Sequence, residues 1–216
     1  MVRVKLCGHT RPDDARLADE LGADMIGIIV GVSVPTPREV SLVQARRILD
    51  SISGDVETVT VTMPESFEDG RDLALKLDVD YLQIHSSLPP SELRKLREGT
   101  EKKIIGVSKV TQGSSESQNQ ISRAKNIAQA SDLLLLDTEV EAAGGTGEVH
   151  DWGISREIVR EVDVPVILAG GLNPFNVGEA IREVEPYGVD VASGVEVEDG
   201  KKDPELVRKF IQNARG

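Results

Sequence analysis

The chain has 216 residues, of which 39% are apolar and 3% are aromatic, so it can build a substantial core in one larger domain or two small ones. Its 25 Lys and Arg residues face 37 Asp and Glu residues, and the net charge of -12 argues against a nucleic-acid partner because phosphate backbones attract basic faces. No apolar run approaches the roughly 18 residues of a membrane span, and the first ten residues do not form a signal peptide. We therefore expect a soluble, cytoplasmic protein with no membrane partner.

The acidic residues are distributed along the chain. Such a surface, with few aromatic side chains, is typical of proteins adapted to high salt, where ions screen the self-repulsion, although an ordinary acidic protein can have the same composition. The single cysteine, Cys7, cannot form an internal disulfide, which indicates a reducing compartment.

Short β-rich runs alternate with amphipathic segments, and no Pro/Gly/Ser-rich linker divides the chain. The predicted strands cover residues 2–7, 24–30, 56–62, 79–85, 103–108, 132–137, 164–169 and 188–192. The predicted helices cover residues 12–21, 68–77, 91–97, 118–130, 155–161 and 203–213, with two more beginning at a Ser41/Gln44 capping box and at an Asn173 cap followed by Pro174.

Eight such units of about 27 residues predict an α/β fold, a single-domain (β/α)8 TIM barrel over residues 1–216. A doubly wound open sheet is the alternative, but it favours a glycine fingerprint after the first strand, and Cys7-Gly8-His9-Thr10 is not one. In a barrel the carboxyl ends of the strands carry the chemistry. At the amino ends, Asp24, Asp80, Asp132 and Asp163 are expected to cap and to face solvent.

Two residues at carboxyl ends are candidates for proton transfer. Cys7 ends the first strand and is either a nucleophile or base, or a small buried hydrophobe. Asp137 follows four leucines, and a carboxyl group at the rim of an apolar run holds its proton more readily, which suits a general acid; the alternative is a loop cap.

Two further residues are candidates for substrate contacts. Arg38 lies on a proline-bracketed loop after the second strand and could clamp a carboxylate, or it could simply be solvated. His85 ends the fourth strand, where an orienting role is favoured over proton donation.

Small residues follow the last two predicted strands, at Gly170-Gly171 and at Ser193-Gly194. Backbone amides there can approach a phosphate closely, and the pairing of both loops favours a phosphate site over two tight turns. Gly144-Gly145-Thr146-Gly147 is interpreted as a mobile lid or a turn near this anion.

Together these motifs resemble the phosphoribosylanthranilate isomerase family of tryptophan biosynthesis, in order over nearly the whole chain. The matching segments are Lys5-Leu6-Cys7-Gly8, Pro35-Thr36-Pro37-Arg38, Leu82-Gln83-Ile84-His85, Leu136-Asp137-Thr138 with Gly144-Gly145-Thr146-Gly147 and Asp151-Trp152, Ala169-Gly170-Gly171-Leu172-Asn173-Pro174, and Ser193-Gly194-Val195-Glu196.

The resemblance implies an Amadori rearrangement of N-(5-phosphoribosyl)anthranilate, with no cofactor and no metal. By position it implies that Cys7 is the general base, Asp137 the general acid and Arg38 the residue facing the anthranilate carboxylate. The Gly170-Gly171 and Ser193-Gly194 loops would form the phosphate site. A phosphorylated small molecule is the expected partner, and the chain would act as a monomer or a homodimer.

Two rival functions remain. The histidine-pathway isomerase performs the same chemistry on a bulkier substrate, but it relies on two aspartates, whereas the first strand here ends in Cys7. A non-catalytic sugar-phosphate binding protein would keep the glycine loops and need neither Cys7 nor Asp137.

Overall fold

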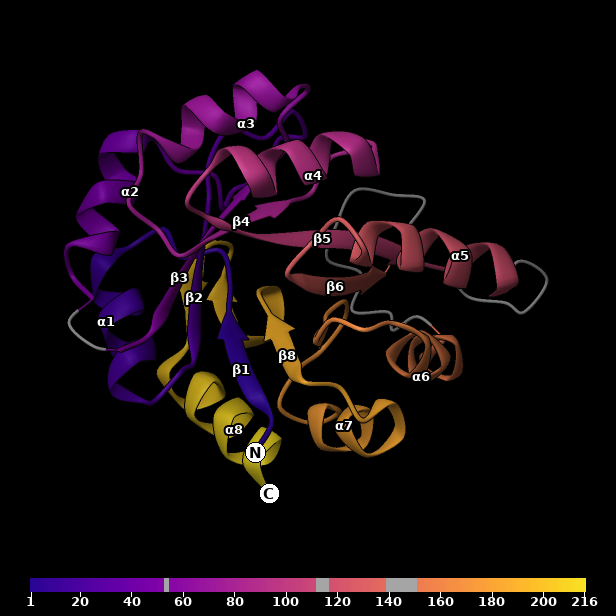
Figure 1. The fold of residues 1–216 in the computed structure, drawn as a ribbon. Coiled ribbons are helices and arrows are strands. Elements are labelled where there is room, and N and C mark those ends of the chain that lie inside the picture. Colours follow the sequence, from indigo (N-terminus) through magenta and orange to yellow (C-terminus); the bar gives the residue numbers. More distant parts are fainter. Residues whose placement is uncertain (53–54, 112–116, 139–150) are drawn as a thin grey trace.

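The fold is taken from a computed structural model that describes residues 1–52, 55–111, 117–138 and 151–216. The described residues form eight parallel strands that close into a barrel, with β1 pairing with both β2 and β8 (Figure 1). The barrel strands are β1 (Arg3–Leu6), β2 (Met25–Ile29), β3 (Glu57–Thr62), β4 (Tyr81–Ile84), β5 (Lys103–Val110), β6 (Leu133–Thr138), β7 (Val166–Leu168) and β8 (Gly188–Val191).

Helices follow the strands and surround the barrel (Figure 1). They are α1 (Pro12–Glu20), α2 (Leu42–Leu49), α3 (Phe67–Ala74), α4 (Pro90–Gly99), α5 (Ser117–Ala128), α6 (Trp152–Glu161), α7 (Val177–Val184) and α8 (Pro204–Arg215). The predicted (β/α)8 barrel is confirmed, and the open doubly wound sheet is excluded because β8 closes onto β1. Across the described ranges, no helix is long and apolar enough to cross a membrane.

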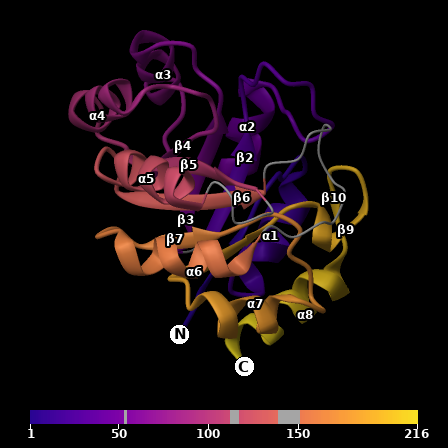
Figure 2. The ribbon, with the colours of Figure 1, turned by 90° about the vertical axis from the view of Figure 1, so that its right-hand side faces the viewer.

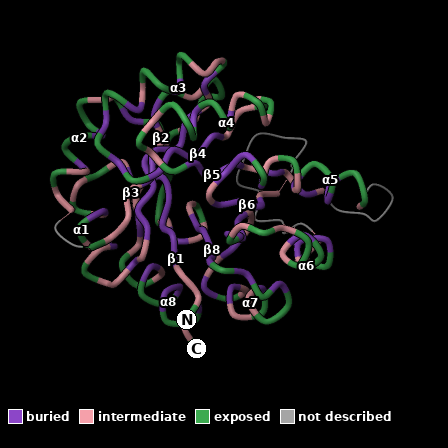
Figure 3. The backbone as a smooth tube through the Cα atoms, in the orientation of Figure 1, coloured by how far each residue is buried: buried purple, intermediate pink, exposed green. Residues whose placement is uncertain are grey.

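The apolar residues form two layers. The larger lies between the outward faces of the strands and the helices, and a second, smaller cluster, which includes Met25, Val61 and Leu135, fills the barrel itself. Strands covered on both faces explain the nearly continuous apolar runs in the sequence. In Figure 3 the central strands are correspondingly buried, while exposed residues lie along the outer helices.

The aspartates at the amino ends link neighbouring strands. A carboxylate oxygen of Asp24 accepts from the Val4 amide at 2.8 Å, one of Asp80 from Thr58 at 2.7 Å, and one of Asp132 from Ile104 at 2.8 Å. The predicted capping role is confirmed for these three residues, and it leaves the opposite end of the barrel for chemistry.

Two predicted helix starts turn out differently. Ser41 caps α2 by accepting from the Gln44 amide at 3.2 Å, but the Gln44 side chain donates to the Thr10 carbonyl, so the reciprocal half of the capping box does not form. The predicted Asn173 cap of α7 is wrong, because Asn176 is the N-cap and α7 begins at Val177. Asn173 instead accepts from the Phe175 and Asn176 amides, in a turn that precedes the helix.

An addition follows β8. The short 3-10 helix η2 (Ser193–Val195) leads into an antiparallel hairpin of β9 (Glu196–Glu198) and β10 (Lys201–Lys202), which the sequence analysis did not predict. The Lys202 amide donates to Asp14 of α1 at 3.1 Å, so the hairpin is tied to the first helix. α8 then brings the C-terminus beside the N-terminus (Figures 1 and 2).

Candidate active site

Cys7 lies just beyond β1 and is 6% exposed. Lys5 and Cys7 point to the same side of the strand, into the barrel, because side chains two residues apart share a face. Gly27 of β2 leaves the room they occupy: a Cβ there would lie 2.8 Å from Cys7 Sγ and 3.2 Å from Lys5 Nζ. The Cys7 sulfur and the Lys5 ammonium group therefore both lie over Gly27.

Lys5 is itself 1% exposed and pairs with Asp190 of β8, Nζ to Oδ1 at 3.1 Å. The barrel closure creates this pair, because Lys5 and Asp190 lie opposite each other in the β1–β8 register. Lys5 also interacts electrostatically with the Cys7 thiol, and both groups border the space above Gly27. A carboxylate, an ammonium group and a thiol are thus grouped in the barrel interior.

Burial raises the pKa of the Cys7 thiol above its ordinary value, and Asp190 adds to this, while Lys5 and Lys202 oppose it. For Lys5, burial alone would lower the pKa, but Asp190 and Cys7 raise it above the ordinary value. Lys5 is therefore a permanent cation next to the thiol at neutral pH.

Asp137 projects from the end of β6 between two basic side chains. Lys109, its register partner on β5, has Nζ 3.0 Å from Asp137 Oδ2, and His85 has Nε2 3.5 Å from the same oxygen. The Thr138 amide donates to Asp137 Oδ1 at 2.9 Å. Both carboxylate oxygens are held in place at the rim of the barrel.

Burial, and then the charge of Lys109, lower the pKa of His85 to about 4, although Asp137 opposes this. His85 is therefore neutral at physiological pH. Its Nε2 lies 3.5 Å from the carboxylate, and its orienting role stays a prediction.

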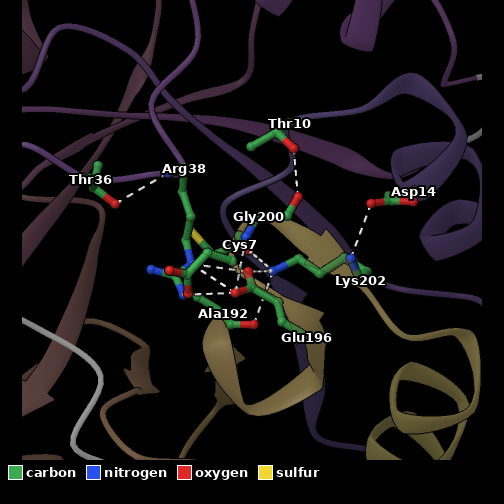
Figure 4. Close-up of polar contacts among 10 residues, drawn as sticks. Cys7, Thr10, Asp14, Thr36, Arg38, Ala192, Glu196, Gly200 and Lys202 are labelled. Atoms are coloured by element: carbon green, nitrogen blue, oxygen red, sulfur yellow. Dashed lines mark hydrogen bonds and ion pairs between the residues drawn. The ribbon is translucent and has the colours of Figure 1, made fainter.

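Arg38 is paired with Glu196, as Figure 4 shows, and its side chain is 17% exposed. Its Nε lies 3.0 and 3.1 Å from the two carboxylate oxygens of Glu196, and its Nη2 lies 2.7 Å from Oε2. Lys202 holds the same carboxylate at 2.8 Å and also donates to the carbonyls of Cys7 at 2.6 Å and Ala192 at 3.0 Å. The β9–β10 hairpin thus connects Arg38 to the backbone of Cys7.

The two predicted phosphate loops lie against each other. A Cβ at Gly194 would overlap the Leu172 carbonyl and lie 3.1 Å from Asn173 Cα, so the start of η2 touches the loop after β7. Gly170 and Gly171 have φ angles of 81° and 67°, which favour glycine. A Cβ at Gly170 would lie 2.6 Å from the Thr138 amide, which places this loop beside the end of β6.

Residues 4–213 match the family model of N-(5'-phosphoribosyl)anthranilate isomerase. The chain belongs to this isomerase family. The isomerase of Haloferax volcanii is 45% identical over 216 residues, covering 100% of this chain and 94% of the relative. The isomerase of Methanopyrus kandleri is 43% identical, covering 98% of both chains.

Solved isomerases share the fold over the whole chain. A structure of phosphoribosylanthranilate isomerase from Thermotoga maritima is 36% identical with a TM-score of 0.88, covering 100% of both chains. A complex of such an isomerase with reduced 1-(o-carboxyphenylamino)-1-deoxyribulose 5-phosphate is 34% identical, with a TM-score of 0.84 and 100% coverage of both chains. The family resemblance stated from the sequence motifs is confirmed.

Cys7, Arg38, His85, Asp137 and the two glycine loops lie at or after the carboxyl ends of barrel strands, as the barrel topology predicted, and their roles stay predictions. The predicted lid residues Gly144, Gly145, Thr146 and Gly147 lie outside the described residues. Where the structure describes the chain, no group of three or more His, Cys, Asp or Glu side chains could hold a metal ion.

No role was predicted from the sequence for Lys5, Asp190, Glu196 or Lys202. Lys5 and Asp190 do leave a signal, since each is a charged residue inside an apolar strand run, at a position whose neighbours on both sides are apolar. Lys202 leaves none, because its partner Cys7 is 195 residues away in the sequence.

Proposed function

We propose that this member of the isomerase family converts N-(5-phosphoribosyl)anthranilate into 1-(2-carboxyphenylamino)-1-deoxyribulose 5-phosphate. The observation that supports it best is the meeting of Cys7, Asp137 and two glycine loops at one end of a barrel whose relatives carry the isomerase name. The reaction is an aldose–ketose isomerisation, an intramolecular oxidoreduction in which C1 of the ribose is reduced as C2 is oxidised. The reaction therefore needs no external oxidant or reductant.

Asp137 acts first, as the general acid. Its proton passes to the ring oxygen of the ribose, the bond from C1 to that oxygen breaks, and the anthranilate nitrogen supplies the electron pair that forms the iminium. Lys109, 3.0 Å from the carboxylate, stabilises the anion that remains. His85 keeps the carboxylate oriented.

Cys7 acts second, as the general base. The thiolate takes the proton from C2 of the opened sugar, the C–H electron pair moves into the bond between C1 and C2, and an enolamine forms. C1 then takes up a proton as the C2 hydroxyl loses its own, and this tautomerisation gives the ketone. A positioned acid or base of this kind contributes about a hundred- to ten-thousandfold in rate.

The remaining residues bind the two ends of the substrate. The loops at Gly170-Gly171 and Ser193-Gly194 offer backbone amides to the phosphate, in the place where barrel enzymes commonly hold it, after strands 7 and 8. Arg38 receives the anthranilate carboxylate: Glu196 occupies its Nε and Nη2 side, and no hydrogen bond to Nη1 is found within the described part of the chain.

We also place the chain in the cytoplasm, supported by its single cysteine, as a monomer or a homodimer. One of the Thermotoga maritima structures is of monomers generated from a dimeric isomerase. Sedimentation of this chain would separate the two states.

Loss of the fluorescence of freshly made phosphoribosylanthranilate tests the activity. The purified chain is expected to consume this substrate catalytically and to leave the bulkier substrate of the histidine-pathway isomerase unchanged. Binding without turnover would instead identify a sugar-phosphate binding protein, and turnover of the bulkier substrate alone would assign the chain to the other isomerase.

A further inference from the structure

Lys5 is a fully buried cation that the proposed proton transfers do not use directly. Taking a charged ammonium group out of water is costly, and a buried ion pair is weak evidence for stability, because an apolar pair of similar volume is often as stable. Apolar residues such as Met25, Ile105 and Leu135 form the cluster that fills the barrel. The position of the pair directly beneath Cys7 therefore calls for another explanation.

The geometry places Lys5 where it can act on the thiol. Lys5 is two residues before Cys7 on the same face of the strand, its ammonium group pairs with Asp190, and its Nζ and Cys7 Sγ both lie close to the Cβ position of Gly27, at 3.2 and 2.8 Å. Gly27 of β2 places no side chain between them, since a Cβ there would lie only 2.8 Å from Cys7 Sγ.

We infer that Lys5, held by Asp190, is a positioning residue that stabilises the thiolate form of Cys7 and so makes it available as the base. The inference rests on the proposed role of Cys7 and deepens it. Burial opposes ionisation of this thiol, and a neighbouring cation offsets such a penalty. The substrate proton then has an acceptor: the thiolate takes it, the S–H bond forms, and Lys5 keeps its own three protons throughout.

Other charged groups also act on Cys7. Asp190 on β8 disfavours the thiolate, whereas Lys202 on β10 favours it, and Cys7 and Arg38 interact electrostatically across the mouth of the barrel. Lys202 donates its hydrogen bonds to two carbonyls and to Glu196, not to the sulfur. Lys5 is thus the cation whose removal should change the ionisation of the thiol most.

Because Cys7 is the only cysteine of the chain, thiolate absorbance near 240 nm reports this residue alone. The absorbance is measured against pH in the wild type and in Lys5→Met, with Cys7→Ser as the baseline. Lys5→Met is expected to raise the midpoint of thiol ionisation by at least about one pH unit and to lower turnover at neutral pH at least about tenfold. The rising limb of the pH–rate profile should move by the same amount, with unchanged affinity for the product analogue.

Lys103→Met is the matched control, because Lys103 lies at the opposite end of the barrel, with Nζ 5.2 Å from the centre of the Tyr81 ring. It should leave the thiol midpoint and turnover unchanged. Lys5→Met also leaves the buried Asp190 without its cation, so Lys5→Met/Asp190→Asn is made in parallel to keep a folded protein. The midpoint of thiol ionisation in this double variant should also rise, but by less than in Lys5→Met, because the negative charge of Asp190 near the thiol is lost as well.

An unchanged midpoint and pH profile in folded Lys5 variants would overturn the inference and leave the role of Cys7 intact. Loss of stability with those readouts unmoved would make Lys5 a purely structural residue, which also overturns it. If Cys7→Ala keeps wild-type turnover, Cys7 is not the base and the proposed mechanism fails. This result is separate from the test of Lys5, because it is measured with Lys5 intact.

Discussion

Arg38, for which we propose a role in binding the anthranilate carboxylate, is held in place by its neighbours without any substrate. Its guanidinium group is held edge-on by Glu196, whose side chain is 4% exposed, and the side chain packs over Gly8, where a Cβ would lie 2.8 Å from Arg38 Cδ. A fixed guanidinium group loses little side-chain entropy when it binds a carboxylate. The sequence marked Arg38 by its proline-bracketed loop, but the partner that orients it is 158 residues away.

Glu196→Gln tests this arrangement. The variant keeps the size of the side chain but removes the charge that holds Arg38 and balances the buried Lys202. We expect KM for phosphoribosylanthranilate to rise about tenfold or more, equivalent to at least ~1.4 kcal/mol of binding, with a smaller change in kcat.

Glu198→Gln is the control, because Glu198 is an exposed residue of the same strand, paired with Lys201 at 3.1 Å. It should leave the kinetics unchanged, since exposed ion pairs contribute little. Equal kinetics in both variants would show that Glu196 does not position Arg38.

His85 gives a pH-dependent prediction. Its pKa is lowered from the ordinary 6.5 to about 4. Between these two pH values, His85 is therefore protonated in the unfolded chain and neutral in the folded chain. The free energy of unfolding should therefore fall as the pH drops from about 6.5 to about 4, by at most ~3 kcal/mol from this residue. Urea unfolding at several pH values measures it, and His85→Gln should flatten the slope. Identical slopes would refute the shift.

At the scale of the elements, the barrel strands were predictable because parallel strands buried on both faces produce short apolar runs between helix signals. The β9–β10 hairpin was not, because its strands are two and three residues long and consist largely of charged residues. The start of α7 was misplaced because Asn173 and Asn176 both have cap chemistry. The structure resolves this competition: Asn176 accepts from the Asn173 amide and donates to the Gly171 carbonyl.

Gly194→Ala tests the contact between the two phosphate loops. An added Cβ would overlap the Leu172 carbonyl, so η2 must shift away from the loop after β7. Inhibition by inorganic phosphate should weaken at least about tenfold if, as we propose, both loops supply backbone amides to the anion.

Gly178→Ala is the matched control on α7, where the nearest atoms to an added Cβ lie at 3.5 Å, an ordinary contact. It should leave phosphate inhibition unchanged. If Gly194→Ala binds phosphate as tightly as the wild type, the phosphate site is elsewhere.

At the scale of the whole molecule, the net charge of -12 should destabilise the folded chain in dilute buffer. Some relatives of this chain come from the halophilic genera Haloferax and Halorubrum. We expect the melting temperature and the activity to rise from low to molar potassium chloride, since salt screens the repulsion between exposed carboxylates. A melting temperature that stays flat or falls across that range would make this an ordinary acidic protein.

The central claim is that Cys7 and Asp137 transfer protons in one reaction sequence. The decisive measurement is turnover of phosphoribosylanthranilate by Cys7→Ala, Asp137→Asn and the double variant, together with their affinity for the reduced product analogue. Each single variant should lose at least about a hundredfold in turnover while binding the analogue normally, and the double variant should lose far less than the product of the two. Near wild-type turnover by Cys7→Ala would reduce Cys7 to a packing residue and contradict the account.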